Sequence, residues 1–326
     1  MYLHNSNIFC NFACRKVQKF TRILNVLLIV AAYGYLGYKV ATYDNYAGLL
    51  AQMREAGVWQ WLCLAGCVLL FPLNRFLEAW KWRYLVRGIE PMGLMEAQRQ
   101  VYYGTIAGFV LPYKIGEYPG RAMLFRQPGD HWLTATCLGL IGGYAMTMVI
   151  VLCGLPAAVL RFASNDSLWW SAGLIIAGGV LAAVALPAVM RQLQSRTWKS
   201  DKSRMLVTNI ARLTFTDVLA LLGISLLRYG CFLLQLLMML LFCRVILDPV
   251  TMLTTMTLYY LLITVTPNVP VAEVAVRGAW AAVLFEPFSA DVAASAVIAT
   301  MLLWAVNTIL PLIVGSLVSR RYSRNI

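Results

Sequence analysis

The sequence predicts an all-α membrane protein with six full spans, two re-entrant helical hairpins and an inverted internal repeat. Of its 326 residues, 60% are hydrophobic and only 13% are charged, whereas soluble domains carry about 25% charged residues. The mean hydropathy is +0.70. Apolar residues gather in segments of about 20 residues, the length that crosses a bilayer. Two of these segments are interrupted by proline and charge, and the features around the two interruptions recur at a steady spacing.

The apolar segments together account for most of the chain. They leave no room for a separate soluble catalytic domain, so we expect any activity to take place in or at the bilayer. The first segment follows a basic start but has no small-residue cleavage site behind it, and we therefore expect a retained span, not a signal peptide. The segments lie near residues 22–42, 58–86, 93–111, 132–155, 168–190, 214–243, 250–285 and 291–318.

The distribution of basic residues decides how the interrupted segments are placed. The chain has 27 Lys and Arg against 14 Asp and Glu, a net charge of +13, which in a multi-span chain records cytoplasmic loops and not a nucleic-acid partner. If segments 93–127 and 250–285 both crossed the bilayer, the basic loop 191–212 would face the side opposite the basic N-terminus. If each segment breaks near mid-depth and returns, every basic stretch faces the cytoplasm. We therefore expect two re-entrant hairpins and cytoplasmic termini.

These placements divide the chain into two halves with short cytoplasmic ends. The predicted parts are a basic N-terminus 1–21, a first half 22–160 with hairpin 93–127, a second half 161–318 with hairpin 250–285 and basic loop 191–212, and a tail 319–326.

The two interruptions resemble each other. The first reads Leu-Pro-Tyr-Lys-Ile-Gly-Glu-Tyr-Pro-Gly-Arg and the second Thr-Pro-Asn-Val-Pro-Val-Ala-Glu-Val-Ala-Val-Arg, so each has proline, then Glu, then Arg four residues later. Inverted repeats whose broken elements meet near the midplane are typical of transporters. We therefore expect both Glu/Arg pairs to meet in one water-filled site. The matching features are Glu117 and Glu273, Arg121 and Arg277, Arg75 and Arg228, and Pro156 and Pro311.

Charged residues at membrane depth are costly, and a functional role is the first hypothesis for them. Guanidinium groups fit phosphate oxygens, and half-helices that begin after the prolines would direct free N–H groups at the same anion. Irregular backbone at this depth must face protein or water. The candidate substrate-binding residues are Arg121, Arg277, Lys114, Arg228 and Arg75, and the predicted hairpin breaks are Pro112, Gly116, Pro267, Asn268 and Pro270.

Two interpretations of the carboxylates remain open. Glu117 and Glu273 each lie one helical turn before an Arg and would pair with it. Either carboxylate would take up a proton as its Arg engages substrate, or it would only neutralise the Arg and hold the hairpin.

The remaining polar residues predict surface roles. Arg75, Glu78, Lys81, Arg83 and Arg87 form a charged cytoplasmic extension of the second span, which would contact anionic head groups. Trp59, Trp61, Trp80, Trp82, Trp169 and Trp170 lie near span ends, as in an aromatic belt. With two histidines and no Ser/His/Asp set or Walker loop, we expect no metal, no cofactor and no enzymatic activity.

The segments Leu111–Glu117 with Arg121, and Pro267–Arg277, resemble the flippase-like membrane domain of bacterial lysylphosphatidylglycerol synthases and of many stand-alone membrane proteins. The resemblance extends over about residues 22–318. It implies translocation of an anionic phospholipid or a polyprenyl-phosphate-type lipid across a bacterial inner membrane. Because the chain ends soon after the last span, we expect the aminoacyl-transferring domain of the synthases, and their activity, to be absent.

The sequence therefore favours a lipid flippase or transporter that moves an anionic, phosphate-bearing head group, with proton coupling as an option. The alternatives are an intramembrane enzyme acting on a lipid phosphate and a membrane scaffold that transports nothing. No nucleic-acid partner is expected.

Overall fold

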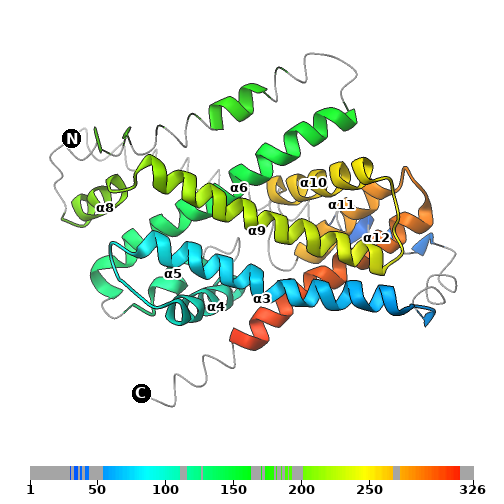
Figure 1. Ribbon diagram of the computed structural model, residues 1–326, viewed down its shortest axis with the longest axis horizontal. Coiled ribbons are helices and arrows are strands. Elements are labelled where there is room, and N and C mark those ends of the chain that lie inside the picture. The colour runs from blue at the N-terminus through cyan, green and yellow to red at the C-terminus, as the bar shows by residue number, and fades with distance from the viewer. Residues whose placement is uncertain are drawn as a thin grey trace, which may run out of the picture.

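The computed structural model describes residues 54–110, 116–125, 128–162, 201–266 and 272–315, with scattered residues between 30 and 43 and between 170 and 192. Every regular element in this described part is a helix, as predicted (Figure 1). The helices are α3 (Val58–Val86), α4 (Leu94–Val110), α5 (Glu117–Ala122), α6 (Pro128–Phe162), α8 (Asp201–Ala211), α9 (Phe215–Phe242), α10 (Pro249–Val265), α11 (Glu273–Phe285) and α12 (Ala290–Trp304), which continues into the π-helical segment η2 (Ala305–Ile309).

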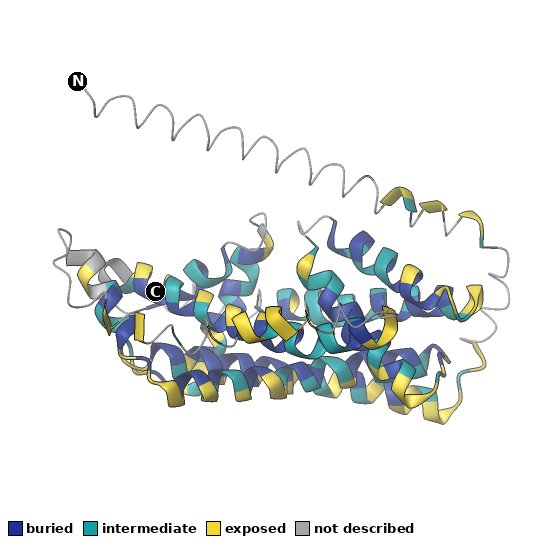
Figure 2. Ribbon diagram, turned by 90° about the horizontal axis from the view of Figure 1, so that it is seen from above, coloured by how far each residue is buried: buried dark blue, intermediate teal, exposed yellow. Residues whose placement is uncertain are grey.

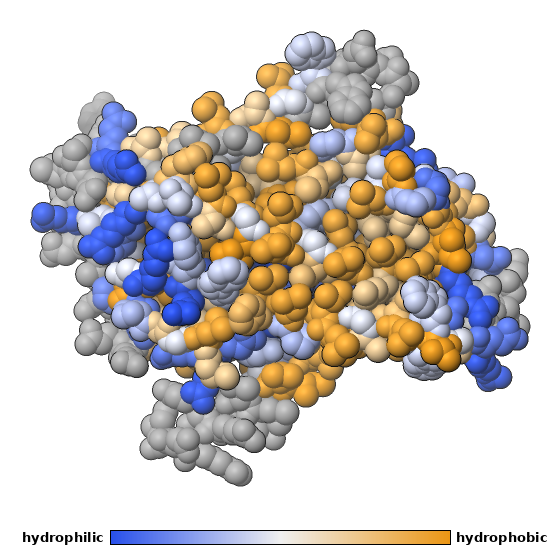
Figure 3. Space-filling view, in the orientation of Figure 1, coloured by the Kyte–Doolittle hydropathy of each residue, from blue (hydrophilic) through white to orange (hydrophobic). Residues whose placement is uncertain are grey.

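Four helices are long and apolar enough to cross a membrane, namely α3, most of α6, α9, and α12 with its continuation to Gly315. They coincide with four of the six predicted spans. The other two predicted spans, 22–42 and 168–190, fall largely outside the described residues. Figure 3 shows apolar residues over the middle of the molecule and hydrophilic residues at its two ends. This distribution is what a bilayer around the middle would require.

Helices α3 and α9 pack side by side and run in opposite directions (Figure 1). Their contacts show the direction, because residue numbers rise along one helix as they fall along the other. The Gln235 side-chain amide donates to the Cys67 carbonyl at 3.1 Å. Further along, the Tyr84 hydroxyl donates to the Asp217 carboxylate at 2.6 Å. The contacts join regions far apart in the chain and so hold its two halves together.

The order of the helices repeats along the chain. Helices α3, α4 and α5 of the first half correspond to α9, α10 and α11 of the second, and the first residues of each corresponding pair are separated by nearly the same length of chain. Helices α4 and α10 are also equal in length, at 17 residues each. The spacing of the Glu/Arg motifs is therefore also the spacing of whole helices.

Side-chain caps fix where two helices of the second half begin. Thr214 and Asp217 cap the start of α9 reciprocally, because the hydroxyl accepts from the Asp217 N–H and the carboxylate accepts from the Thr214 N–H. Asp248 accepts from the Thr251 N–H at 2.9 Å, and Pro249 occupies the first turn of α10.

The predicted basic loop 191–212 is partly helical, because it contains α8. Val207 and Ile210 lie one turn apart on α8 and are buried, so one apolar face of this helix packs against the rest of the molecule, including α6. The hydropathy of this segment is too low to predict a membrane span. A helix that does not cross the membrane needs only one apolar face to pack against the protein.

The buried residues form two apolar clusters. One lies mainly among α6, α9, α10, α11 and α12, and the other among α3, α4, α6 and the start of α9. Figure 2 shows exposed residues along the outer edges of the long helices and buried ones toward the inside. Exposed side chains such as Leu69 and Leu227 are apolar, which suits contact with lipid tails. Charged residues buried beside these clusters are therefore exceptional.

Candidate functional site

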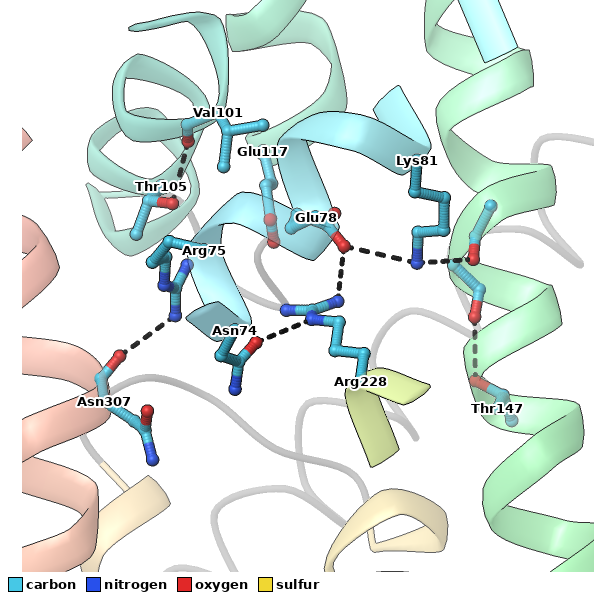
Figure 4. A network of polar contacts seen from close by, with 12 residues as sticks. Asn74, Arg75, Glu78, Lys81, Val101, Thr105, Glu117, Thr147, Arg228 and Asn307 are labelled. Carbon is cyan, nitrogen blue, oxygen red and sulfur yellow. Dashed lines mark hydrogen bonds and ion pairs between the residues drawn. The ribbon is translucent and has the colours of Figure 1, made fainter. Parts of the chain in front are cut away.

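Charged side chains from α3, α5 and α9 meet inside the molecule. Most of these charged side chains are almost fully buried among apolar helices. Part of the group is drawn in Figure 4. We call this group the Glu78 cluster, and it consists of Asn74, Glu78, Lys81, Glu117, Arg121 and Arg228, joined by hydrogen bonds and ion pairs, and of Arg75, which interacts electrostatically with Glu78, Glu117 and Arg228.

Glu78 is the centre of the cluster. Its side chain is 3% exposed, and its Oε1 accepts from Arg121 Nη2 at 2.7 Å. Its Oε2 accepts from Arg228 Nη1 and lies 3.2 Å from Lys81 Nζ. One carboxylate from α3 thus joins cations from α3, α5 and α9. Charge-assisted hydrogen bonds of this kind are among the stronger polar contacts in proteins.

Arg121 is enclosed on all sides by the described residues. Its Nη2 also donates to Glu117, as the spacing of four residues predicts. Its guanidinium carbon lies 5.4 Å from the ring centroid of Trp82 and 5.0 Å from that of Tyr118. Trp82 is fully buried and donates to Gln100 at 2.7 Å, so its predicted place in an aromatic belt is wrong. Its indole N–H is satisfied inside the protein, not at a membrane surface.

Close packing of α4 on α5 brings Arg121 to this position. A Cβ at Gly104 would overlap the Glu117 carbonyl oxygen and would lie 2.5 Å from Arg121 Cγ. A Cβ at Gly108 would lie 3.0 Å from the Glu117 Cβ. Small residues on α4 therefore let α5 approach closely enough for its Glu and Arg to reach α3.

Asn74 and Arg228 extend the cluster toward the centre of the membrane helices. Arg228 Nε donates to Asn74 Oδ1 at 2.9 Å. Neighbouring Arg75, which is 7% exposed, donates from Nη2 to the backbone carbonyl of Asn307 at 3.2 Å. Asn307 lies in the π-helical segment, so this contact joins α3 to the end of α12 (Figure 4).

The charges of the cluster do not balance. Its cations are Arg75, Lys81, Arg121 and Arg228, whereas its carboxylates are only Glu78 and Glu117. Counted over the described residues, two positive charges remain without an equal number of negative ones. A buried charge that lacks a counter-ion is costly, and an excess of positive charge favours an anion nearby.

The second Glu/Arg pair lies elsewhere. Arg277 Nη2 donates to Glu273 Oε1 at 2.9 Å, again as the spacing predicts. Their helix α11 packs on α10 and α12, whereas α5 packs on α4 and α6. Figure 1 shows α5 and α11 in different parts of the molecule. The structure therefore brings Arg75, Glu117, Arg121 and Arg228 together but does not bring Glu273 and Arg277 into the same cluster, which corrects the prediction of one shared site. Each pair stays within its own half because each short helix packs on its own partner helices.

The charged extension predicted for the second span is also partly wrong. Arg75, Glu78 and Lys81 are buried, and only Arg83 and Arg87 are exposed. The buried three lie at intervals of three residues and so share one face of α3. That spacing was the sequence signal for a buried polar face, and Glu78 and Lys81 are the members that the repeated motifs did not assign to the site.

The predicted hairpin breaks are described only in part. Gly116 immediately precedes the first residue of α5 and has a helical backbone conformation, with φ −71° and ψ −11°. Five predicted residues lie outside the described part of the chain, namely Pro112, Lys114, Pro267, Asn268 and Pro270.

Comparison of the chain with protein-family models, with curated proteins and with solved structures gives no match. The chemistry of the site therefore has to be argued from its own geometry, which offers three guanidinium groups, an ammonium group and a side-chain amide around two carboxylates.

Proposed function

We propose that this protein is a membrane lipid flippase that moves an anionic, phosphate-bearing head group between leaflets. The observation that carries the proposal is the buried excess of positive charge in the Glu78 cluster. Each charge at membrane depth costs about 2.5–3.5 kcal/mol even on the insertion scale. A purely structural ion-pair network costs least when its cations and carboxylates are equal in number, whereas a surplus of cations favours a bound anion.

The depth of the cluster supports this interpretation. Arg228 lies close to the middle of α9, which runs from Phe215 to Phe242. Glu78 lies well inside α3, which ends at Val86, and the helical rise of about 1.5 Å per residue places it about 12 Å from that end. Charged groups so far from a surface usually mark a path for substrate or ions.

The proposal includes six full spans and two re-entrant hairpins in an inverted repeat. It is supported by the opposite directions of the corresponding helices α3 and α9. In Figure 1, α6 begins at the end of the molecule where α3 stops, and α12 begins at the end where α9 stops. The intervening pairs α4–α5 and α10–α11 would then enter and leave on the same side, which is the geometry of a re-entrant hairpin.

The positive-inside tendency orients the proposed flippase. Basic α8 lies at the end of the molecule where α9 begins and α3 stops, and this end would face the cytoplasm. In that orientation both termini are cytoplasmic, and a bacterial inner membrane is the proposed location.

The proposed mechanism is competition for the cluster's cations. Arg121 and Arg228 are held by Glu78 in the present state. An arriving phosphate oxygen would replace a carboxylate oxygen on a guanidinium group, because both anions offer a pair of oxygens to the planar guanidinium fork. Glu117, which also pairs with Arg121 and whose side chain is 25% exposed, would be displaced from that guanidinium group and would then take up a proton. The same proton role is proposed for Glu273 in the second half.

The direct test is a vesicle assay with the purified full chain and head-group-labelled lipids. We expect the label to change sides without a change in lipid mass. Arg228→Gln should slow the movement strongly, whereas Arg83→Gln, which removes an exposed charge from α3, should not. A wild-type protein that leaves sidedness unchanged would refute the flippase, and a changed lipid mass would indicate an enzyme instead.

Proton coupling has its own test. Glu117→Gln and Glu273→Gln should abolish the response of translocation to an imposed pH gradient. Equal responses in both variants and the wild type would leave the flippase standing but remove its proton coupling.

A further inference from the structure

Arg75 has an unusual environment for a buried cation. It donates a hydrogen bond to the Asn307 carbonyl and contacts the ring of Phe71, whose centroid is 5.8 Å from the guanidinium carbon. Its Nε has no hydrogen-bond partner among the residues that the structure describes. Within the described residues no carboxylate forms a salt bridge with it, whereas Arg121 has two such partners and Arg228 has one.

A second donor beside Arg75 is also unsatisfied. Asn74 is fully buried, and its Oδ1 is fixed as an acceptor by Arg228. The amide nitrogen must therefore be a donor, and no acceptor for it is present in the described part of the chain. Figure 4 shows Asn74 between Arg75 and Arg228, with this nitrogen directed away from Glu78. Leaving such a donor buried and unpaired costs about 1–3 kcal/mol, so a partner is expected in some functional state.

The second half of the chain contributes a third polar side chain, that of Asn307, next to Asn74 and Arg75. Asn307 lies in the π-helical segment η2. Such segments frequently occur at functional sites. Its amide nitrogen donates to Gln235 at 3.2 Å, and its Oδ1 accepts from none of the described residues. Unsatisfied donors on α3 and an unsatisfied acceptor on η2 thus lie at the junction of α3, α9 and η2.

We propose that Asn74, Arg75 and Arg228 form a site for a doubly charged phosphate monoester, the terminal phosphate of a lipid head group, at the junction of the two halves. This inference rests on the proposed function and names its substrate class. The two orphan donors of Asn74 and Arg75 match phosphate oxygens, and Asn307 Oδ1 matches a hydroxyl substituent elsewhere on the lipid head group.

Charge balance selects the monoester over the diester. The cluster carries two surplus positive charges among Arg75, Lys81, Arg121, Arg228, Glu78 and Glu117. A phosphate monoester carries a charge of about −1.5 to −2 at pH 7, which cancels the surplus. A phosphodiester such as that of phosphatidylglycerol carries a single negative charge and would leave one cation uncompensated.

The test measures binding and not transport, so it can fail independently of the proposed function. The purified full chain in a neutral detergent is titrated by calorimetry with short-chain phosphatidic acid and with phosphatidylglycerol of the same acyl chains. A third titration uses inorganic phosphate, which separates a lipid ligand from a free one. We expect phosphatidic acid to bind at least about tenfold more tightly than phosphatidylglycerol, the effect of one further charged hydrogen bond.

Arg75→Gln removes one surplus charge and should abolish that preference, whereas Arg83→Gln on the same helix should retain it. Arg75→Lys, which keeps the charge, should also keep a preference for the monoester. Equal wild-type affinities for the two lipids would overturn the proposal without recourse to any variant, as would an unchanged preference in folded Arg75→Gln. Binding of inorganic phosphate as tight as that of phosphatidic acid would overturn the assignment to a lipid. Selective binding without movement of lipid would support this site while refuting the flippase.

Discussion

Glu78 on α3 and Arg228 on α9 form an ion pair between two helices that hold corresponding places in the internal repeat. The other oxygen of the same carboxylate pairs with Arg121 on α5. A single buried side chain therefore holds the first short helix and both halves of the chain in one arrangement. Any movement of one half against the other must break or exchange these contacts.

Neutralising Glu78 should destabilise the fold more than neutralising any exposed carboxylate. Glu78→Gln would leave three cations facing a neutral amide, and breaking a buried pair in this way costs about 3–5 kcal/mol. The free energy of unfolding in detergent micelles, from chemical denaturation, measures the loss. Glu55→Gln changes an exposed carboxylate next to α3 and serves as the control, with an expected loss of less than about 1 kcal/mol. Equal losses in the two variants would contradict the central role of Glu78.

The contact between α4 and α5 predicts a contrast between two glycines. In Gly104→Ala the new Cβ would overlap the Glu117 backbone, which cannot move as a flexible side chain would. Overpacking of this kind typically costs about 1–3 kcal/mol. Among the described residues, no atom lies within 4 Å of a Cβ added at Gly223 on α9, so Gly223→Ala should leave stability unchanged or raise it by up to about 1 kcal/mol. Thermal unfolding of both variants checks the contrast, and translocation should fall only in Gly104→Ala.

The all-helical class and the four long apolar helices could be predicted from the sequence because hydropathy is a local property. The apolar segment 58–86 coincides with α3, and the segment 214–243 extends just beyond α9 at each end. Proline and charge in segments 93–127 and 250–285 predicted interruptions, and each segment does divide into two helices. The pairs Glu117–Arg121 and Glu273–Arg277 were likewise predictable, because residues four apart on a helix are neighbours.

The full set of contacts in the Glu78 cluster could not be predicted from the sequence, because they join residues far apart along the chain. Glu78 lies 43 residues from Arg121 and 150 from Arg228 along the chain, and no spacing rule connects them. The direction of each packed helix also decides which charges meet. The motif suggested that two identical Glu/Arg pairs would face each other, but α5 and α11 pack against different helices and so separate the pairs.

The contacts of Asp217 should hold the end of α3 against the start of α9 at the proposed cytoplasmic end. Its Oδ1 accepts from the Tyr84 hydroxyl and from Arg87 Nη2, each at 2.6 Å, while its Oδ2 caps α9 through Thr214. Asp217→Ala removes all of these contacts, and we expect a loss of about 1–3 kcal/mol. Tyr84→Phe removes one hydrogen bond and should cost about 1 kcal/mol. Hydrogen exchange should rise mainly in the first turns of α9, and a uniform rise over the whole chain would argue against a local stabilising effect of Asp217.

The amides of Gln235 and Asn307 should be energetically coupled. Gln235 is fully buried, accepts from Asn307 Nδ2 at 3.2 Å and donates to the Cys67 carbonyl at 3.1 Å, so it links α3, α9 and the π-helical segment. Gln235→Leu and Asn307→Leu each leave a polar partner unsatisfied, and we expect each single change to cost about 1–3 kcal/mol. In the double variant both members of the pair are apolar, so the total should be smaller than the sum by about 0.5–3 kcal/mol. Unfolding free energies of the four proteins in the cycle give this coupling, and Tyr84→Phe combined with Asn307→Leu provides a distant pair that should add. If the Gln235 and Asn307 changes also add, the link between the two halves at this point does not contribute to stability, and the position of η2 beside Arg75 must be set by packing alone.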